Sequence, residues 1–268
     1  MPTGVYSAKK KDGSIYYRSN ITFQSKHISL GSFSTEDDAH AAYLEASELL
    51  ENNAVTLLNI HNHIRLLSFD KAVCLLNFRD NNLYFHNPIY LRKGYFSYFL
   101  SDDIELKFDI DDLFYYAGHR IQKRQGHLFV NDYGMQYSIL SRYGIRPYAV
   151  AGRDYVFFNG DSNDFRYSNI MNINRYHGVY SYEQNGTTHY KVFIHINGNY
   201  KIGTYPDEAS AAVAYNKAAD LAKTAGVSKQ FPANYVESLN PREYANLYTH
   251  VKISQKYKEY LKTILTSD

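Results

Sequence analysis

Residues 178–205 read GVYSYEQNGTTHYKVFIHINGNYKIGTY, and this stretch decides the fold that the sequence predicts. Its side chains alternate in character, which is typical of strands that bury only one face. The alternation predicts one face with Tyr190, Val192 and Ile194, and an opposite face with Lys191, Phe193 and His195. We therefore expect three short antiparallel strands here, with the apolar set facing a core.

The next segment, DEASAAVAYNKAADLAKTAG at 207–226, predicts a helix that packs on this sheet. Its alanines recur at i, i+3 and i+7, so Ala211, Ala214 and Ala218 share one face with Tyr215. Small side chains let a helix lie close to a sheet. Asp207 stands where an N-cap is expected.

The same unit occurs a second time near the start of the chain. Residues 4–33 read GVYSAKKKDGSIYYRSNITFQSKHISLGSF, and TEDDAHAAYLEASELL follows at 35–50, with Thr35 as the expected N-cap. Gly31 and Gly203 close the last strand of each copy and lie 172 residues apart. One long interval with a different segment between predicts two copies of one domain and not a solenoid.

Charge is divided within the first copy. Residues 3–31 hold five Lys or Arg and one acid, whereas residues 33–50 hold five acids and no base. The net charge of the whole chain is only +2. A basic sheet backed by an acidic helix directs positive potential to one side, which favours nucleic acid, although a solvated basic face is an alternative.

Both copies resemble the apetala/ethylene-response-factor DNA-binding domain. The Gly-Val-Tyr start, the Leu-Gly-x-Phe or Ile-Gly-x-Tyr closure and the AAY or VAY of the helix carry the resemblance. It implies that each sheet enters the major groove of double-stranded DNA and reads bases with its exposed face. The chain has no Trp, so Tyr and Phe would take the stacking roles that tryptophans have in plant members. The base-contacting residues expected are Tyr6, Arg18, Asn20, Thr22 and Ser29 in the first copy, and Tyr180, Tyr182, Lys191, Phe193, His195 and Lys201 in the second.

The middle of the chain resembles the HNH homing endonuclease family, which often carries an apetala-type domain. Asn159-Gly160-Asp161 is similar to the turn of that family, and Asp164, Arg166, Asn169 and Ile170 are similar to its next segment, which we expect to be a helix. The family's catalytic histidine falls at Phe157, and no histidine occurs between His127 and His177. Phenylalanine neither accepts a proton nor binds a metal. We therefore expect a ββα nuclease fold without catalytic residues, metal or cofactor.

Two other readings stay open for the middle region. In an active HNH-type homing or nicking endonuclease, His119 or His127 would be the base, and Asp132 or Asp154 would hold the metal. In a protein-interaction scaffold, the exposed aromatic face would bind another protein. Arg166 is a candidate phosphate contact, or else a structural partner of Asp161 or Asp164.

The sequence predicts an α+β protein: two small modules of a three-stranded sheet and one helix, flanking a middle α+β domain. The expected divisions are a first DNA-binding module at 1–60, a connector at 61–85, the HNH-like domain at 86–174, a second module at 175–232 and a helical tail at 233–268. Within the tail, 238–266 predicts one helix that packs on the middle domain or forms a homodimer. Cys74, the only cysteine, is expected in a core.

We expect an intracellular, soluble protein without a membrane segment, since no apolar run approaches the length of a span. The predicted function is sequence-specific binding of double-stranded DNA, as in a transcription regulator derived from a homing endonuclease of a mobile element that has lost catalysis.

Overall fold

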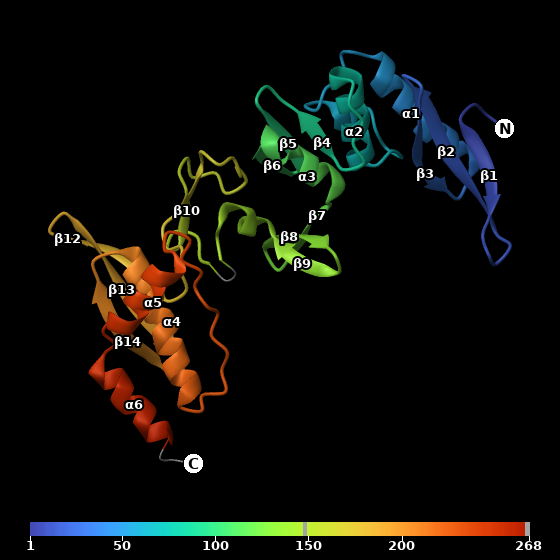
Figure 1. The fold of residues 1–268 in the computed structure, drawn as a ribbon. Coiled ribbons are helices and arrows are strands. Elements are labelled where there is room, and N and C mark those ends of the chain that lie inside the picture. The colour runs from blue at the N-terminus through green and yellow to red at the C-terminus, as the bar shows by residue number, and fades with distance from the viewer. Residues whose placement is uncertain (147–148, 266–268) are drawn as a thin grey trace. The chain divides into compact units, whose positions relative to one another are not determined.

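The computed structural model describes residues 1–146 and 149–265 (Figure 1). In this part of the chain the protein is mixed α+β, with six α-helices, four three-stranded antiparallel sheets and one two-stranded sheet. Contacts divide it into two units: unit 1 is 1–139 with 159–169, and unit 2 is 140–158 with 170–268. The boundaries between the units fall inside 86–174, the range that the sequence predicts to be one middle domain.

The first repeat, here called module one, has the predicted three strands and helix. Its strands pair in the order β1-β2-β3, antiparallel throughout, and α1 packs on the sheet. Its elements are β1 (Val5–Lys9), β2 (Ile15–Phe23), β3 (Lys26–Phe33) and α1 (Glu36–Glu51). The predicted alternation is confirmed, because Ser19 and Ile21 are buried whereas Arg18 and Thr22 are exposed.

The second repeat, module two, has the same arrangement in unit 2 (Figure 1). Val192 and Ile194 are buried under the helix, as the alternation predicts. Its elements are β12 (Val179–Gln184), β13 (Thr187–His195), β14 (Asn199–Tyr205) and α4 (Glu208–Thr224).

The helices begin where the sequence predicts. The Thr35 side chain accepts a hydrogen bond from the Asp38 amide, and the Asp207 side chain accepts one from the Ser210 amide. Each helix then buries its alanine face against the sheet, so that the helix backbone lies close to the strands. The fully buried members are Ala39, Ala42 and Ala46 in α1, and Ala211, Ala214 and Ala218 in α4.

A glycine at the start of each module has a conformation that only glycine adopts without strain. Gly4 and Gly178 have φ of +77° and +70°, in the left-handed region. A Cβ on Gly178 would lie 2.4 Å from both the Phe193 carbonyl oxygen and the Tyr215 ring, and one on Gly4 would lie 2.1 Å from the Tyr43 ring. The glycine therefore allows the first strand to pass directly beneath the helix tyrosine in both modules.

Unit 1 continues beyond module one without a linker. The expected connector contains helix α2 (Phe69–Asn81), which Ser68 caps, and its leucines share one core with module one. Arg79 of α2 donates hydrogen bonds to the carbonyls of Leu49, Asn52 and Val55 at the end of α1. Residues 61–85 are thus a part of the folded unit. Cys74 is buried, as predicted, and burial raises its pKa to about 12.

Two more three-stranded sheets belong to unit 1. An aromatic core lies beside the first of them, where the Phe108 and Phe165 rings stack with 5.4 Å between their centres. The elements are β4 (Ile89–Leu91), β5 (Tyr95–Ser101), β6 (Ile104–Asp109), α3 (Leu113–Gly118), β7 (Ile121–Arg124), β8 (His127–Asp132) and β9 (Met135–Ser138). Short 3-10 turns occur at 60–62, 110–112 and 139–143.

The segment that resembles an HNH motif does not form the expected helix. Strands β10 (Tyr155–Phe157) and β11 (Ile170–Asn172) pair with each other, and residues 158–169 form a loop. The Asn159 side chain accepts from the Asp161 amide, and the Asp161 carboxylate accepts from the Asn163 amide. These short polar side chains satisfy backbone groups locally, which favours turns over a helix.

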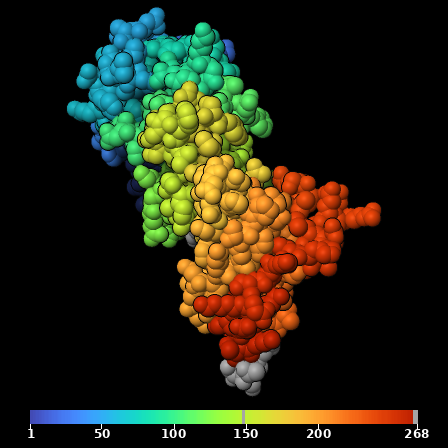
Figure 2. All heavy atoms as spheres, turned by 90° about the vertical axis from the view of Figure 1, so that its left-hand side faces the viewer, coloured from blue at the N-terminus to red at the C-terminus, as the bar shows by residue number. Residues whose placement is uncertain are grey.

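The expected single helix over 238–266 is two helices, α5 (Pro241–His250) and α6 (Gln255–Leu265), while Thr266 lies outside the described residues. The helix is interrupted at 251–254 because Val251 and Ile253 enter the core of module two and the Ser254 amide bonds to the Ile202 carbonyl. In Figure 2 the red C-terminal part lies against the orange residues of module two. The apolar residues of this segment that are buried, Val251, Ile253, Tyr257 and Leu261, therefore pack on module two.

No helix in residues 1–146 and 149–265 combines the length and apolar character needed to cross a membrane.

Candidate nucleic-acid interface

The open face of the module one sheet brings together all five residues predicted for it. Tyr6 lies opposite Arg18, and Asn20 lies opposite Ser29, so these pairs project from the same side of the sheet. Tyr6, Arg18, Thr22 and Ser29 are exposed and Asn20 is partly buried. The face away from α1 is therefore accessible.

The structure adds three residues to this face that sequence reasoning missed. The Tyr16 hydroxyl accepts hydrogen bonds from Arg18 Nε at 3.1 Å and from its terminal nitrogen at 2.6 Å, which fixes the guanidinium. His27 Nδ1 lies 3.2 Å from the Thr22 hydroxyl. Ser32 of β3 lies directly opposite Arg18 of β2. The sequence could have indicated Tyr16, because residues two apart on a strand share a face. The position of Ser32 on this face could not be predicted, because it depends on the register shift between Ser19 and Asn20.

The corresponding face of module two also gathers its predicted residues. Tyr180 lies opposite Lys191, and Phe193 lies opposite Lys201. Lys191 Nζ lies 3.8 Å from the centre of the Tyr182 ring, a cation–π contact. The Tyr180 and Phe193 rings meet edge to face at 6.0 Å. His195 is exposed at the end of β13, where Nδ1 lies 2.9 Å from Asn199 Oδ1.

The two faces share one cross-strand row, which we call the central row. In module one it is Tyr6, Arg18 and Ser32; in module two it is Tyr180, Lys191 and Thr204. Both sheets have a register shift directly after it, between Ser19 and Asn20 and between Val192 and Phe193. A tyrosine, a cation and a hydroxyl thus stand side by side at the same place in both modules.

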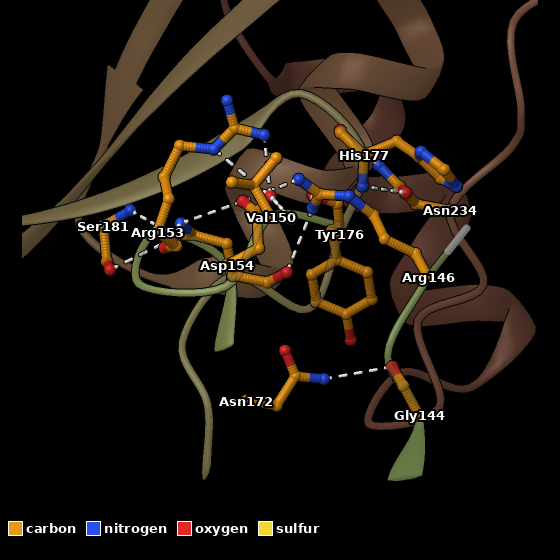
Figure 3. Close-up of polar contacts among 11 residues, drawn as sticks. Gly144, Arg146, Val150, Arg153, Asp154, Asn172, Tyr176, His177, Ser181 and Asn234 are labelled. Atoms are coloured by element: carbon orange, nitrogen blue, oxygen red, sulfur yellow. Dashed lines mark hydrogen bonds and ion pairs between the residues drawn. The ribbon is translucent and has the colours of Figure 1, made fainter. Parts of the chain in front are cut away.

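A buried carboxylate holds another cation at the edge of the module two face. Asp154 is fully buried and lies 2.9 Å from a terminal nitrogen of Arg146 and 2.7 Å from one of Arg153 (Figure 3). Burial by itself would raise the pKa of Asp154, but hydrogen bonds from Arg153 and the Val150 amide, with the charge of Arg146, lower it overall. The Asp154 side chain is therefore a structural anion.

This arrangement places Arg153 over the Tyr180 ring, with 5.7 Å between the guanidinium carbon and the ring centre. Half of the Arg153 side chain remains exposed. Arg146 also donates to the carbonyls of Asn174 and Tyr176, and Asn174 accepts from the Ser181 amide of β12 (Figure 3). The Asp154 cluster thus joins Arg146, residues 149–154 and residues 174–176 to the first strand of module two.

Arg166 forms the structural pair that was its alternative interpretation. It donates to both carboxylate oxygens of Asp164, at 2.8 and 2.5 Å, and its guanidinium carbon lies 5.2 Å from the centre of the Tyr95 ring. The hydrogen bond from Arg166 is the main reason that the pKa of Asp164 is lowered. Asp161 pairs instead with Lys107 at 3.1 Å. Arg166 does not belong to either sheet face.

The residues considered for a nuclease site are spread over several elements. Phe157 lies in β10 opposite Ile170. His119 Nε2 lies 3.5 Å from Asp132, and its ring stacks on Tyr115 at 4.2 Å. His127 is exposed at the start of β8. No group of three or more His, Cys, Asp or Glu suited to a metal ion occurs in 1–146 and 149–265.

Comparisons of the chain with protein-family models, with curated proteins and with solved structures found no match.

Proposed function

We propose that the protein is a sequence-specific binder of double-stranded DNA in which each module presents its open sheet face to the major groove. The central row carries this proposal. Arg18 and Lys191 stand at equivalent positions in the two modules, each beside a tyrosine and a hydroxyl. Arginine and lysine donate to the O6 and N7 acceptors of guanine, and hydroxyls contact any base.

The chemistry of the faces supports DNA over a protein partner. Arg18, Lys191 and Lys201 supply cations for bases or phosphates, and the acidic side chains of α1 lie on its helix, behind the sheet. The face of module two adds aromatic rings, which contact the thymine methyl group or stack. The Asp154 cluster presents Arg153 beside Tyr180, where a phosphate contact would fix the position of the sheet on the duplex.

Two readers on one chain would bind a two-part site. The second contact is then intramolecular, so the affinity for a duplex with both half-sites exceeds that of either module alone. A role in transcription regulation, derived from a homing endonuclease that has lost catalysis, follows from this proposal together with the resemblance of 155–170 to an HNH motif.

The test is selection of bound duplexes from a random pool in the presence of Mg²⁺, with the recovered strands run on a denaturing gel. We expect a defined motif in two parts and intact strands. A pool without enrichment, at low salt as well, would contradict the proposal and favour a protein-interaction scaffold. Nicked strands would instead establish an endonuclease, the alternative that uses His119 or His127.

A further inference from the structure

A groove of about 680 Å³ lies along β14 of module two, between this strand and residues 252–257. The groove shares Phe193 and Lys201 with the open face, so the two surfaces are continuous. We call it the β14 groove. Its lining includes three lysines, Lys201, Lys252 and Lys256, and no acidic residue.

The position of these lysines follows from the way the C-terminal segment packs. The Ser254 amide donates to the Ile202 carbonyl at 2.8 Å, and the Tyr205 hydroxyl donates to the Lys252 carbonyl at 2.7 Å. Val251 and Ile253 are buried in the core, and Lys252 between them is exposed. Because the residues on either side of it are buried, the Lys252 side chain lies on the outside, beside the edge strand of the module two sheet.

The three ammonium groups have no carboxylate partner within residues 1–146 and 149–265. Lys201, Lys252 and Lys256 are all exposed, and the Ser254 and Thr204 hydroxyls lie in the same lining. A concave surface with three unpaired cations and hydroxyl donors is complementary to phosphate oxygens. Phosphate contacts set the register and orientation of a protein on DNA and carry no sequence information.

We propose that the β14 groove binds the sugar–phosphate backbone of the DNA that module two reads, with Lys252 and Lys256 as the phosphate contacts. This inference rests on the proposed function and assigns a role to the C-terminal segment. In module one, by contrast, no backbone hydrogen bond among the described residues joins β3 to a segment outside its sheet.

The experiment compares wild type with the Lys252→Ala/Lys256→Ala double variant by fluorescence anisotropy. The probes are the selected duplex and a shuffled duplex of equal length, titrated between about 50 and 400 mM NaCl. Each phosphate contact contributes about 0.9 to the slope of log K against log salt, so we expect the variant to lower that slope by about 2. Both duplexes should lose affinity by the same factor, and Lys252→Arg/Lys256→Arg should restore the slope.

The matched control is Lys223→Ala/Lys258→Ala, which removes two exposed lysines of unit 2 that do not line the β14 groove. It should leave the slope close to that of wild type. An unchanged slope in the Lys252/Lys256 variant, or a loss confined to the selected duplex, would overturn the groove assignment while wild type still binds DNA. Wild type that binds neither duplex at low salt would overturn the proposed function, and the groove assignment with it.

Discussion

Modules one and two have the same backbone plan with different side chains. Both have a left-handed glycine beneath a helix tyrosine, a register shift after the central row and an alanine helix face. Their open sheet faces differ: module one presents Tyr16, Arg18 and Thr22, whereas module two presents packed aromatic rings with lysines. The shared features are those that the close approach of helix and sheet requires, so face chemistry can vary while the fold is kept.

The supports of the two modules differ more than the modules themselves. Module one is extended by α2, whose Arg79 caps the end of α1. Module two is supported by the Asp154 cluster at β12 and by residues 251–254 at β14. Support at the sheet edges places extra cations next to the open sheet face, whereas support at the end of the helix does not. If the proposed function holds, we therefore expect module two to contribute most of the affinity for DNA.

The largest expected effect comes from removing the charge in the cluster that supports module two. Asp154→Asn leaves Arg146, whose side chain is 10% exposed, without its counter-ion. Breaking a buried pair in this way costs about 3–5 kcal/mol. We expect urea unfolding followed by circular dichroism to show this loss. Asp102→Asn, in the exposed turn after β5, is the control and should leave the midpoint unchanged. Equal midpoints for the two variants would contradict the role of the cluster.

The shared glycine gives the next largest effect. Gly178→Ala combines an unfavourable φ with contacts of 2.4 Å to the Phe193 carbonyl oxygen and the Tyr215 ring, and we expect a loss of about 2–4 kcal/mol. Gly4→Ala should cost a similar amount in module one. Gly186→Ala is the matched control, since its φ is +72° and no atom lies within 4 Å, so only the conformational cost of about 1–2 kcal/mol remains. The urea midpoints of the three variants measure the difference; equal losses at 178 and 186 would show that the close approach is not rigid.

Substitutions in the central row test the proposed DNA contacts of each module separately. Arg18→Ala and Lys191→Ala should each weaken binding of the selected duplex by about 1–3 kcal/mol and relax preference at different base positions, because the residues belong to different modules. Anisotropy on the selected duplex and its single-base variants measures both effects. Arg65→Ala and Lys223→Ala remove exposed cations outside the sheets and serve as controls. Unchanged affinity in both Arg18→Ala and Lys191→Ala would refute the assignment of the faces.

A smaller effect is expected from pH. The pKa of Asp154 in unit 2 and that of Asp164 in unit 1 are both lowered in the folded protein. A lowered carboxyl pKa contributes stability that is full above the unfolded value, about 3.9, and is lost as pH falls through the folded value. We expect the urea concentration at the unfolding midpoint to decrease as the pH is lowered below about 4. This decrease should be smaller for Asp154→Asn than for wild type. Identical pH profiles would show that Asp154 is not the titrating anion.

The repeat could be predicted from sequence because local rules decide it. Alternation fixed the buried face at Val192 and Ile194, and Thr35 and Asp207 marked the helix starts. The break after His250 could not be predicted in this way. The helical spacing continues across it, and the break depends on contacts far away in sequence: the burial of Val251 and Ile253 in the core of module two and the bond from Ser254 to Ile202.

The candidate site could be predicted from the sequence only where strand alternation decides it. Residues on one strand, such as Arg18, Asn20 and Thr22, follow from alternation alone. Ser32 and Thr204 were missed because the register shift moves them into the central row. The place of Arg153 beside Tyr180 could not be predicted, since it depends on the buried Asp154 pairing with two arginines.

The division of the chain into two units decides which module a continuous fragment can contain with its supporting residues. Unit 2 is contained in the continuous stretch 140–268, whereas unit 1 needs residues 159–169 from beyond that boundary. Those residues include Phe165, which is buried against Phe108, and the backbone that pairs with Lys107. A shortened protein that ends at residue 139 would therefore expose an aromatic core. One that begins at 140 keeps all of module two with its Asp154 support and C-terminal lysines, while residues 159–169 inside it lose their partners in unit 1, so module two is the copy that a single segment can carry whole.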